Sequence, residues 1–163
     1  MSYIREIKNL EISKDTSNST QVISTTYTEL SGSRISYTPR ISSGNVIIKF
    51  SQQFRASPDN DTVIQHKIQE STDNFVSNSS DISGSYLAIK SLGTTDSNYV
   101  NGNDSWFYES SVALESWSGK KYFRVMLKTD INTSEFTMQD TTLWNSVNSQ
   151  FAIIPVTITI KEV

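Results

Sequence analysis

The chain of 163 residues contains no cysteine, a single histidine and only three prolines. Without cysteine there is no disulfide, no thiolate nucleophile and no cysteine-based metal site, so stability has to come from packing or from oligomer formation. No uninterrupted apolar stretch approaches about eighteen residues, and residues 1–14 carry charges throughout instead of an apolar signal-peptide core. We therefore expect synthesis in a cytoplasm, without membrane insertion.

Charge is also scarce. Charged residues make up 19% of the chain, the net charge is −3, and no block of five or six like charges occurs. A protein that binds a polyanion needs a concentration of lysine and arginine on one surface, because phosphate contacts supply most of the affinity. Nucleic acid is therefore not expected as a partner.

Small polar residues and aromatic residues dominate instead. The chain has 28 serines, 17 threonines and 12 asparagines, together with seven tyrosines, seven phenylalanines and three tryptophans. Threonine suits a pleated sheet and serine and asparagine suit turns, whereas all three compete with the backbone hydrogen bonds of a helix. The aromatic content is too high for a disordered chain, and the length suits one domain. This composition predicts a single all-β domain.

Alternation of apolar and polar residues marks the strands. In 46–56, Val46, Ile48, Phe50 and Phe54 share one face, and in 62–71 His66 shares a face with two isoleucines. A turn signal, SPDND, separates the two segments, which predicts a β-hairpin. Further strands are expected at 21–30, 34–38, 85–91, 105–115, 120–129, 134–139 and 150–162. Nine or ten short strands with polar turns are typical of an antiparallel β-sandwich.

The sequence offers little catalytic chemistry. His66, the one histidine, alternates with apolar residues, so a partly buried structural histidine with a hydrogen-bond partner is expected rather than a general base. The acidic and amide clusters at 59–61 and 96–104 are better explained by turns than by calcium, since they lack the EF-hand pattern. No phosphate-binding glycine loop or nucleophile elbow is present. We expect no enzyme activity, no cofactor and no metal.

The three tryptophans allow two interpretations. Trp106 lies in a predicted strand, Trp117 in the turn SWSG and Trp144 after a polar run. Aromatic side chains on a surface would indicate carbohydrate or receptor binding, whereas core packing or subunit contacts are the commoner role. The polar segments 71–84 and 93–104 are predicted to be long loops, which is where binding residues commonly lie.

Three segments resemble a group of small virion proteins of marine tailed bacteriophages, cyanophages in particular. They are ISYTPRISSGNVIIKFSQQFRAS (35–57), LESWSGKKYFRVMLKTD (114–130) and TTLWNSVNSQFAIIPVTITIKEV (141–163), so the resemblance covers most of residues 34–163. It implies a jelly-roll-like sandwich, commonly a homotrimer, that is displayed on the particle as a capsid decoration or as part of a fibre. Localisation in the virion follows from the same resemblance.

Two non-enzymatic functions follow from this resemblance. As a capsid decoration or cement protein, the chain would use residues 1–20 as an arm and linker and 21–163 as the domain, with the major capsid protein or neighbouring virion proteins as partners. The arm residues expected to contact the capsid are Tyr3, Ile4, Ile7, Leu10 and Ile12. As a receptor-recognition module of a tail or head fibre, it would use loop residues Asn74, Asn98, Tyr99 and Asn101. A carbohydrate-active enzyme on the same fold is a third hypothesis, which would need two carboxylates facing a cleft.

Overall fold

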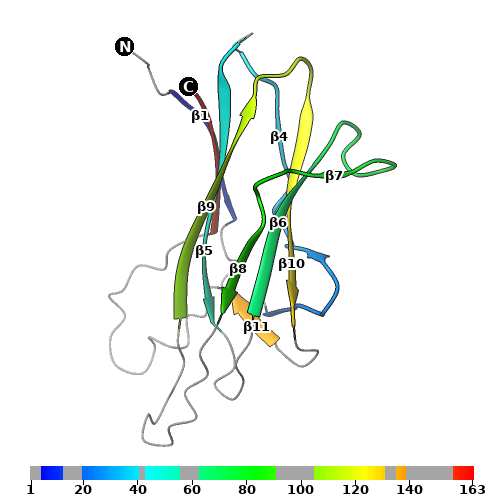
Figure 1. Ribbon diagram of the computed structural model, residues 1–163, viewed down its shortest axis with the longest axis vertical. Coiled ribbons are helices and arrows are strands. Elements are labelled where there is room, and N and C mark those ends of the chain that lie inside the picture. Colours follow the sequence, from blue (N-terminus) through cyan, green and yellow to red (C-terminus); the bar gives the residue numbers. More distant parts are fainter. Residues whose placement is uncertain are drawn as a thin grey trace, which may run out of the picture.

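The protein is built from two antiparallel β-sheets that face each other (Figure 1). The computed structural model describes residues 5–12, 20–40, 43–55, 63–90, 105–130, 135–138 and 156–163, and it has no helix in these ranges. The first sheet contains β1 (Arg5–Ile12), β2 (Thr20–Val22), β5 (Asn45–Arg55), β9 (Ser105–Glu115), β11 (Glu135–Met138) and β12 (Val156–Glu162). The second sheet contains β3 (Thr28–Glu29), β4 (Ile35–Tyr37), β6 (Val63–Ser71), β7 (Ser80–Asp81), β8 (Leu87–Lys90) and β10 (Lys121–Thr129).

The strand order is that of a jelly roll. In the first sheet β5 pairs with β9 on one edge and with β12 and β11 on the other. On their far edges β12 pairs with β1, and β11 pairs with β2. In the second sheet β10 lies between β6 and the short strands β3 and β4, while β7 and β8 pair with the far edge of β6. Short strands that share an edge count as one broken strand, which gives two four-stranded sheets with the crossovers of a double Greek key. The predicted antiparallel, jelly-roll-like sandwich is confirmed.

The predicted hairpin between 46–56 and 62–71 is wrong. β5 and β6 belong to opposite sheets and do not pair with each other. Their apolar faces meet across the sandwich instead, where the Phe50 ring stacks on His66 with 5.1 Å between centroids and 10° between planes. Alternation shows which face of a strand is buried. It does not show whether the next strand pairs beside it in the same sheet or covers that face from the opposite sheet.

The predicted strand at 21–30 is interrupted, because the chain changes sheets there. β2 ends at Val22 in the first sheet and β3 begins at Thr28 in the second. Between them the hydroxyl groups of Ser24 and Thr26 hydrogen-bond at 2.8 Å, and the Ser24 carbonyl accepts from the amide of Thr129. Where a strand ends, local hydrogen bonds from serine and threonine side chains take the place of the backbone hydrogen bonds between strands. These residues are therefore common in turns.

β12 lies inside the first sheet, between β1 and β5. Ile158 and Ile160 are buried, as alternation predicts. Among the described strands β1 is at the edge next to β12, with a register shift between Glu6 and Lys8 that places a β-bulge at Ile7. Residues 5–12 are therefore a strand of the sheet.

The core fills the space between the sheets. Its members are apolar and almost fully buried: Ile23, Leu30, Ile35, Tyr37, Val46, Ile48, Phe50, Ile64, Ile68, Ile82, Val112, Phe123, Val125, Leu127, Ile158 and Ile160. Trp117, from the connection between β9 and β10, packs edge-on against Tyr37 and Phe123 at one end of this core. For this tryptophan the core-packing interpretation is correct.

One buried carboxylate ties the two sheets together. Glu162 of β12 is only 5% exposed, and its Oε1 accepts hydrogen bonds from the Tyr37 hydroxyl at 2.6 Å and from the backbone amide of Arg40. Tyr37 belongs to β4 of the opposite sheet. A buried carboxylate is stable only when such donors replace its water, so this contact fixes β4 against β12.

Candidate functional site

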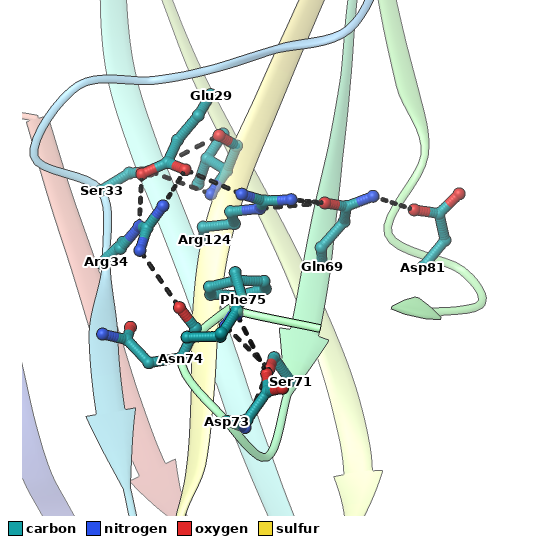
Figure 2. Close-up of polar contacts among 12 residues, drawn as sticks. Glu29, Ser33, Arg34, Gln69, Ser71, Asp73, Asn74, Phe75, Asp81 and Arg124 are labelled. Carbon is teal, nitrogen blue, oxygen red and sulfur yellow. Dashed lines mark hydrogen bonds and ion pairs between the residues drawn. The ribbon is translucent and has the colours of Figure 1, made fainter. Parts of the chain in front are cut away.

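A chain of polar contacts crosses the second sheet from β3 to β7 (Figure 2). The Glu29 carboxylate accepts two hydrogen bonds from Arg34, at 2.7 and 2.9 Å, and one from Arg124 at 2.9 Å. Arg124 also donates twice to Oε1 of Gln69, whose amide nitrogen donates to Asp81. Hydrogen bonds from Arg34 and Arg124 lower the pKa of Glu29 although burial opposes this shift. The five side chains, which come from β3, the β3–β4 connection, β10, β6 and β7, are thereby connected to one another.

The β6–β7 loop, residues 72–79, is anchored to this chain of contacts and projects from the sheet in Figure 1. The Phe75 ring lies under the guanidinium groups of Arg124 and Arg34, at 4.1 and 5.3 Å from the ring centroid. Arg34 also donates a hydrogen bond to the carbonyl of Asn74 at 3.2 Å. Both Asn74 and Phe75 have left-handed backbone conformations, with φ of 61° and 64°. That conformation is uncommon for a bulky residue and persists only where the surroundings hold it.

Hydrogen bonds within the loop hold it as well. Asp73 accepts from the hydroxyl groups of Ser77 and Ser71 and from two backbone amides, and these bonds keep its pKa well below the usual range. The Asn78 side chain accepts from Ser71 and from the amide of Thr72, and it donates to the Thr72 hydroxyl. The loop thus has one defined conformation, in which Val76 is 84% exposed.

Asp81, in β7, is the last residue in the chain of polar contacts that begins at Glu29. Burial works against its ionisation, but hydrogen bonds from Lys67, Tyr86 and Gln69 outweigh burial and lower its pKa to about 2. Lys67 neighbours His66 in β6 and therefore lies on the outer face of the strand, yet it is only 9% exposed. Its ammonium group lies 4.2 Å from the ring centroid of Tyr27 and 5.8 Å from that of Tyr86. The outer face of a strand is here covered by aromatic rings, so a lysine is buried with its charge paired.

A small pocket opens beside the foot of the β6–β7 loop. Its volume is about 60 Å³, and it is lined by Glu70, Ser71, Thr72, Asn78, Ser80 and Lys121. Glu70 and Lys121 form an ion pair at 2.8 Å between Oε2 and Nζ. Every side chain of the lining carries a hydrogen-bonding group.

Of the predicted loop residues, Asn74 lies in the β6–β7 loop and is exposed. Asn98, Tyr99 and Asn101 lie outside the described residues, and so do the acidic and amide clusters at 59–61 and 96–104. Within the part of the chain that the structure describes, no group of three or more potential metal ligands occurs. In the same part, no helix is long and apolar enough to cross a membrane.

Of the predicted arm residues, Ile7, Leu10 and Ile12 lie in β1. Leu10 is the register partner of Ile158, and Ile12 that of Val156. Tyr3 and Ile4 precede the described residues, and Trp144 also lies outside them.

His66 is completely buried, rather than partly as expected, and burial lowers its pKa to about 4. A neutral imidazole between two sheets has no access to a substrate.

Sequence reasoning missed the contacts among Glu29, Arg34 and Arg124. Alternation within β10 does place Arg124, between buried Phe123 and Val125, on the outer face. Nothing in the sequence shows that Glu29, which is 95 residues away, lies opposite that arginine.

The sequence matches no model of a protein family and none of the curated proteins. A solved structure with a similar chain path is that of Eiger TNF from S. frugiperda. The two share 8% sequence identity, the match covers 84% of this chain and 89% of that chain, and the TM-score is 0.42. The assignment to the jelly-roll fold rests on the strand order.

Proposed function

We propose that the protein is a non-enzymatic structural component of a bacteriophage particle, a decoration or cement protein that binds the outer capsid surface as an oligomer. A homotrimer in the virion, with the major capsid protein as partner, is the expected form. The resemblance of three segments to phage virion proteins supports this function. The jelly roll is also a fold that viral capsid domains use.

The observation that carries the proposal is the position of β1. The predicted arm includes this strand, and among the described strands β1 pairs with β12 alone. Its other edge presents backbone N–H and C=O groups, which a strand of a neighbouring subunit can pair with. Tyr3 and Ile4, just before β1, would add apolar contacts on the same neighbour. Several such contacts in one oligomer combine into strong attachment even when each is weak.

The structure determines how this proposal is tested. Deletion of residues 1–12 would remove β1 and uncover β12, so lost binding could reflect unfolding. Deletion of residues 1–4 removes Tyr3 and Ile4 and leaves the β1–β12 pairing intact. We expect the full chain to be a trimer by light scattering, to co-sediment with empty capsids and to raise their melting temperature, and the shortened chain to bind more weakly.

An Ala113→Ser variant is the control. Ala113 is an exposed residue of β9, so the variant should bind capsids like the parent chain. A full-length oligomer that neither sediments with capsids nor changes their melting temperature contradicts the decoration function.

The β6–β7 loop favours a second candidate, a receptor-recognition module of a tail or head fibre. Its left-handed Asn74 and Phe75, held by two arginines, present Val76 at 84% exposure. A loop held in its binding conformation loses little entropy when it binds. We expect Val76→Ser to reduce adsorption of the particle to host cells without changing particle stability, and Ala113→Ser to leave adsorption unchanged. Normal adsorption of the Val76→Ser particle contradicts this candidate.

A further inference from the structure

The pocket at the foot of the β6–β7 loop has a specific set of hydrogen-bonding groups. Glu70 supplies a carboxylate and Lys121 an ammonium group, and these lie 2.8 Å apart. Thr72 and Ser80 add hydroxyl groups at exposed positions, and Asn78 adds an amide. Acceptors, donors and groups that do both thus line one pocket.

The charge of the pocket is balanced, which selects against ions. An anion would be attracted by Lys121 and repelled by Glu70, and a cation would be attracted by Glu70 and repelled by Lys121. An apolar group would remove water from both charges without replacing their hydrogen bonds, which is unfavourable. A neutral ligand with donors and acceptors side by side avoids both costs.

Unused hydrogen-bonding capacity points the same way. Among the contacts of the described residues, the Asn78 amide nitrogen donates to Thr72 alone, although it carries two hydrogens. The Lys121 ammonium carries three hydrogens, donates one hydrogen bond, to Glu70, and lies 5.2 Å from the ring centroid of Trp117. The remaining hydrogens are available to acceptors in the pocket.

The size of the pocket limits the ligand further. A volume of about 60 Å³ holds about two water molecules. Two neighbouring hydroxyl groups, or one hydroxymethyl group, occupy a similar volume, and each hydroxyl both donates and accepts. The rest of a sugar ring would lie over the exposed rim formed by Thr72, Asn78 and Ser80.

Two features hold the pocket in its shape. Phe75, whose ring contacts both Arg34 and Arg124, fixes the loop that contributes Thr72 and Asn78. The backbone pairing of Glu70 with Ser80 in β7 fixes the opposite wall. A site that is already formed binds a weakly held ligand without an added cost for ordering.

We propose that this pocket is a subsite for the hydroxyl-bearing edge of a neutral saccharide. The inference goes beyond capsid decoration, and it deepens the receptor-recognition candidate, on which its biological use rests. It assigns to Glu70 and Lys121 the acceptor and donor for two adjacent hydroxyl groups, with Thr72, Asn78 and Ser80 completing the contact.

The test is a titration of the isotope-labelled full chain, followed by amide chemical shifts, with three separate probes: methyl α-D-glucopyranoside, methyl β-D-galactopyranoside and N-acetylglucosamine. At least one probe should cause saturable shifts of the Asn78 side-chain amide and of the Thr72 and Ser80 backbone amides, with a Kd of about millimolar size. Thr72→Val and Ser80→Ala should each weaken binding by roughly threefold to tenfold, because each removes one hydrogen bond. Ser79→Ala, next to the pocket but outside its lining, should bind like the parent chain.

Other outcomes overturn the proposal. No saturable shift with any of the three sugars up to about 50 mM, far above the expected Kd, excludes the subsite. Inorganic phosphate that shifts the same amides at lower concentration than the sugars shows an anion site instead.

The subsite and the receptor function fail separately. Normal adsorption of the Val76→Ser particle together with sugar binding by the purified chain removes the receptor function and leaves the subsite. Lost adsorption without sugar binding removes the subsite alone.

Discussion

Acid should destabilise this protein through one side chain. His66 is buried between the sheets against Phe50, and burial lowers its pKa from 6.5 to about 4. In the unfolded chain the imidazole is exposed and regains its ordinary pKa. Between pH 6.5 and pH 4 the unfolded state therefore binds more protons than the folded state, and stability falls as the pH falls through that window.

The size of the loss follows from the two pKa values. A difference of one pKa unit corresponds to about 1.4 kcal/mol, so the contribution of His66 is about 3 kcal/mol once the pH is below 4. By pH 5 about 2 kcal/mol of it should already be lost. That is a large share of the roughly 5–15 kcal/mol by which small domains are stable.

The assay compares the parent chain with His66→Phe by urea unfolding at pH 7.5, 6 and 5. The phenylalanine keeps an aromatic ring against Phe50 and cannot titrate, and any packing cost of the larger ring is the same at every pH. Carboxylates such as Asp81 titrate in both chains and cancel in the comparison. We expect the parent chain to lose about 2 kcal/mol more than the variant between pH 7.5 and pH 5.

Equal losses in the two chains would refute this reasoning. A direct check is available because the chain has a single histidine, whose ring proton signal is unambiguous. A signal that titrates near pH 6.5 in the folded protein would show that the imidazole is not held neutral by burial.

Three further predictions concern packing and the loop. Phe123→Ala should cost about 3–5 kcal/mol in urea unfolding, because it empties a fully buried site of the core; a loss below about 1 kcal/mol would contradict the packing described here. Tyr37→Phe should cost about 1–3 kcal/mol, since it leaves buried Glu162 without its hydroxyl donor, and an unchanged denaturation midpoint would contradict that role. Phe75→Ala should speed hydrogen exchange of the amides in residues 72–78 while lowering stability by only about 1 kcal/mol, and unchanged exchange there would show that the ring does not hold the loop.

Much of the fold could be predicted from alternation. The buried faces of 46–50, 123–127 and 158–160 follow from a period of two, because successive side chains on a strand point to opposite sides. Pairing partners do not follow from alternation. A second strand with one apolar face can pair beside β5 in the same sheet or cover β5 from the facing sheet, as β6 does where His66 stacks on Phe50. The hairpin prediction failed for this reason.

The candidate site could be predicted only in outline. Composition predicts a loop at 71–84, whereas the structure has the loop at 72–79 and a short strand, β7, at Ser80–Asp81. Asn74 is exposed in this loop as expected. The conformation of the loop depends on Arg34 and Arg124, which contact Phe75 from positions far away in the sequence. The pocket likewise needs Lys121 beside Glu70, a contact across 51 positions of the chain. Contacts of this kind are set by topology, which a single sequence does not reveal.

The central position of β12 has a consequence for folding. β1 and β5 are not neighbours until β12 lies between them, and β12 comes from residues 156–162. During synthesis both earlier strands leave the ribosome long before the strand that joins them, so the first sheet can close only after residues 156–162 have been made. Strand pairing over such sequence distances is slow and leaves unpaired edges exposed meanwhile. We expect this sheet to complete its folding only after β12 has been synthesised, with aggregation of chains that still lack β12 as the competing reaction.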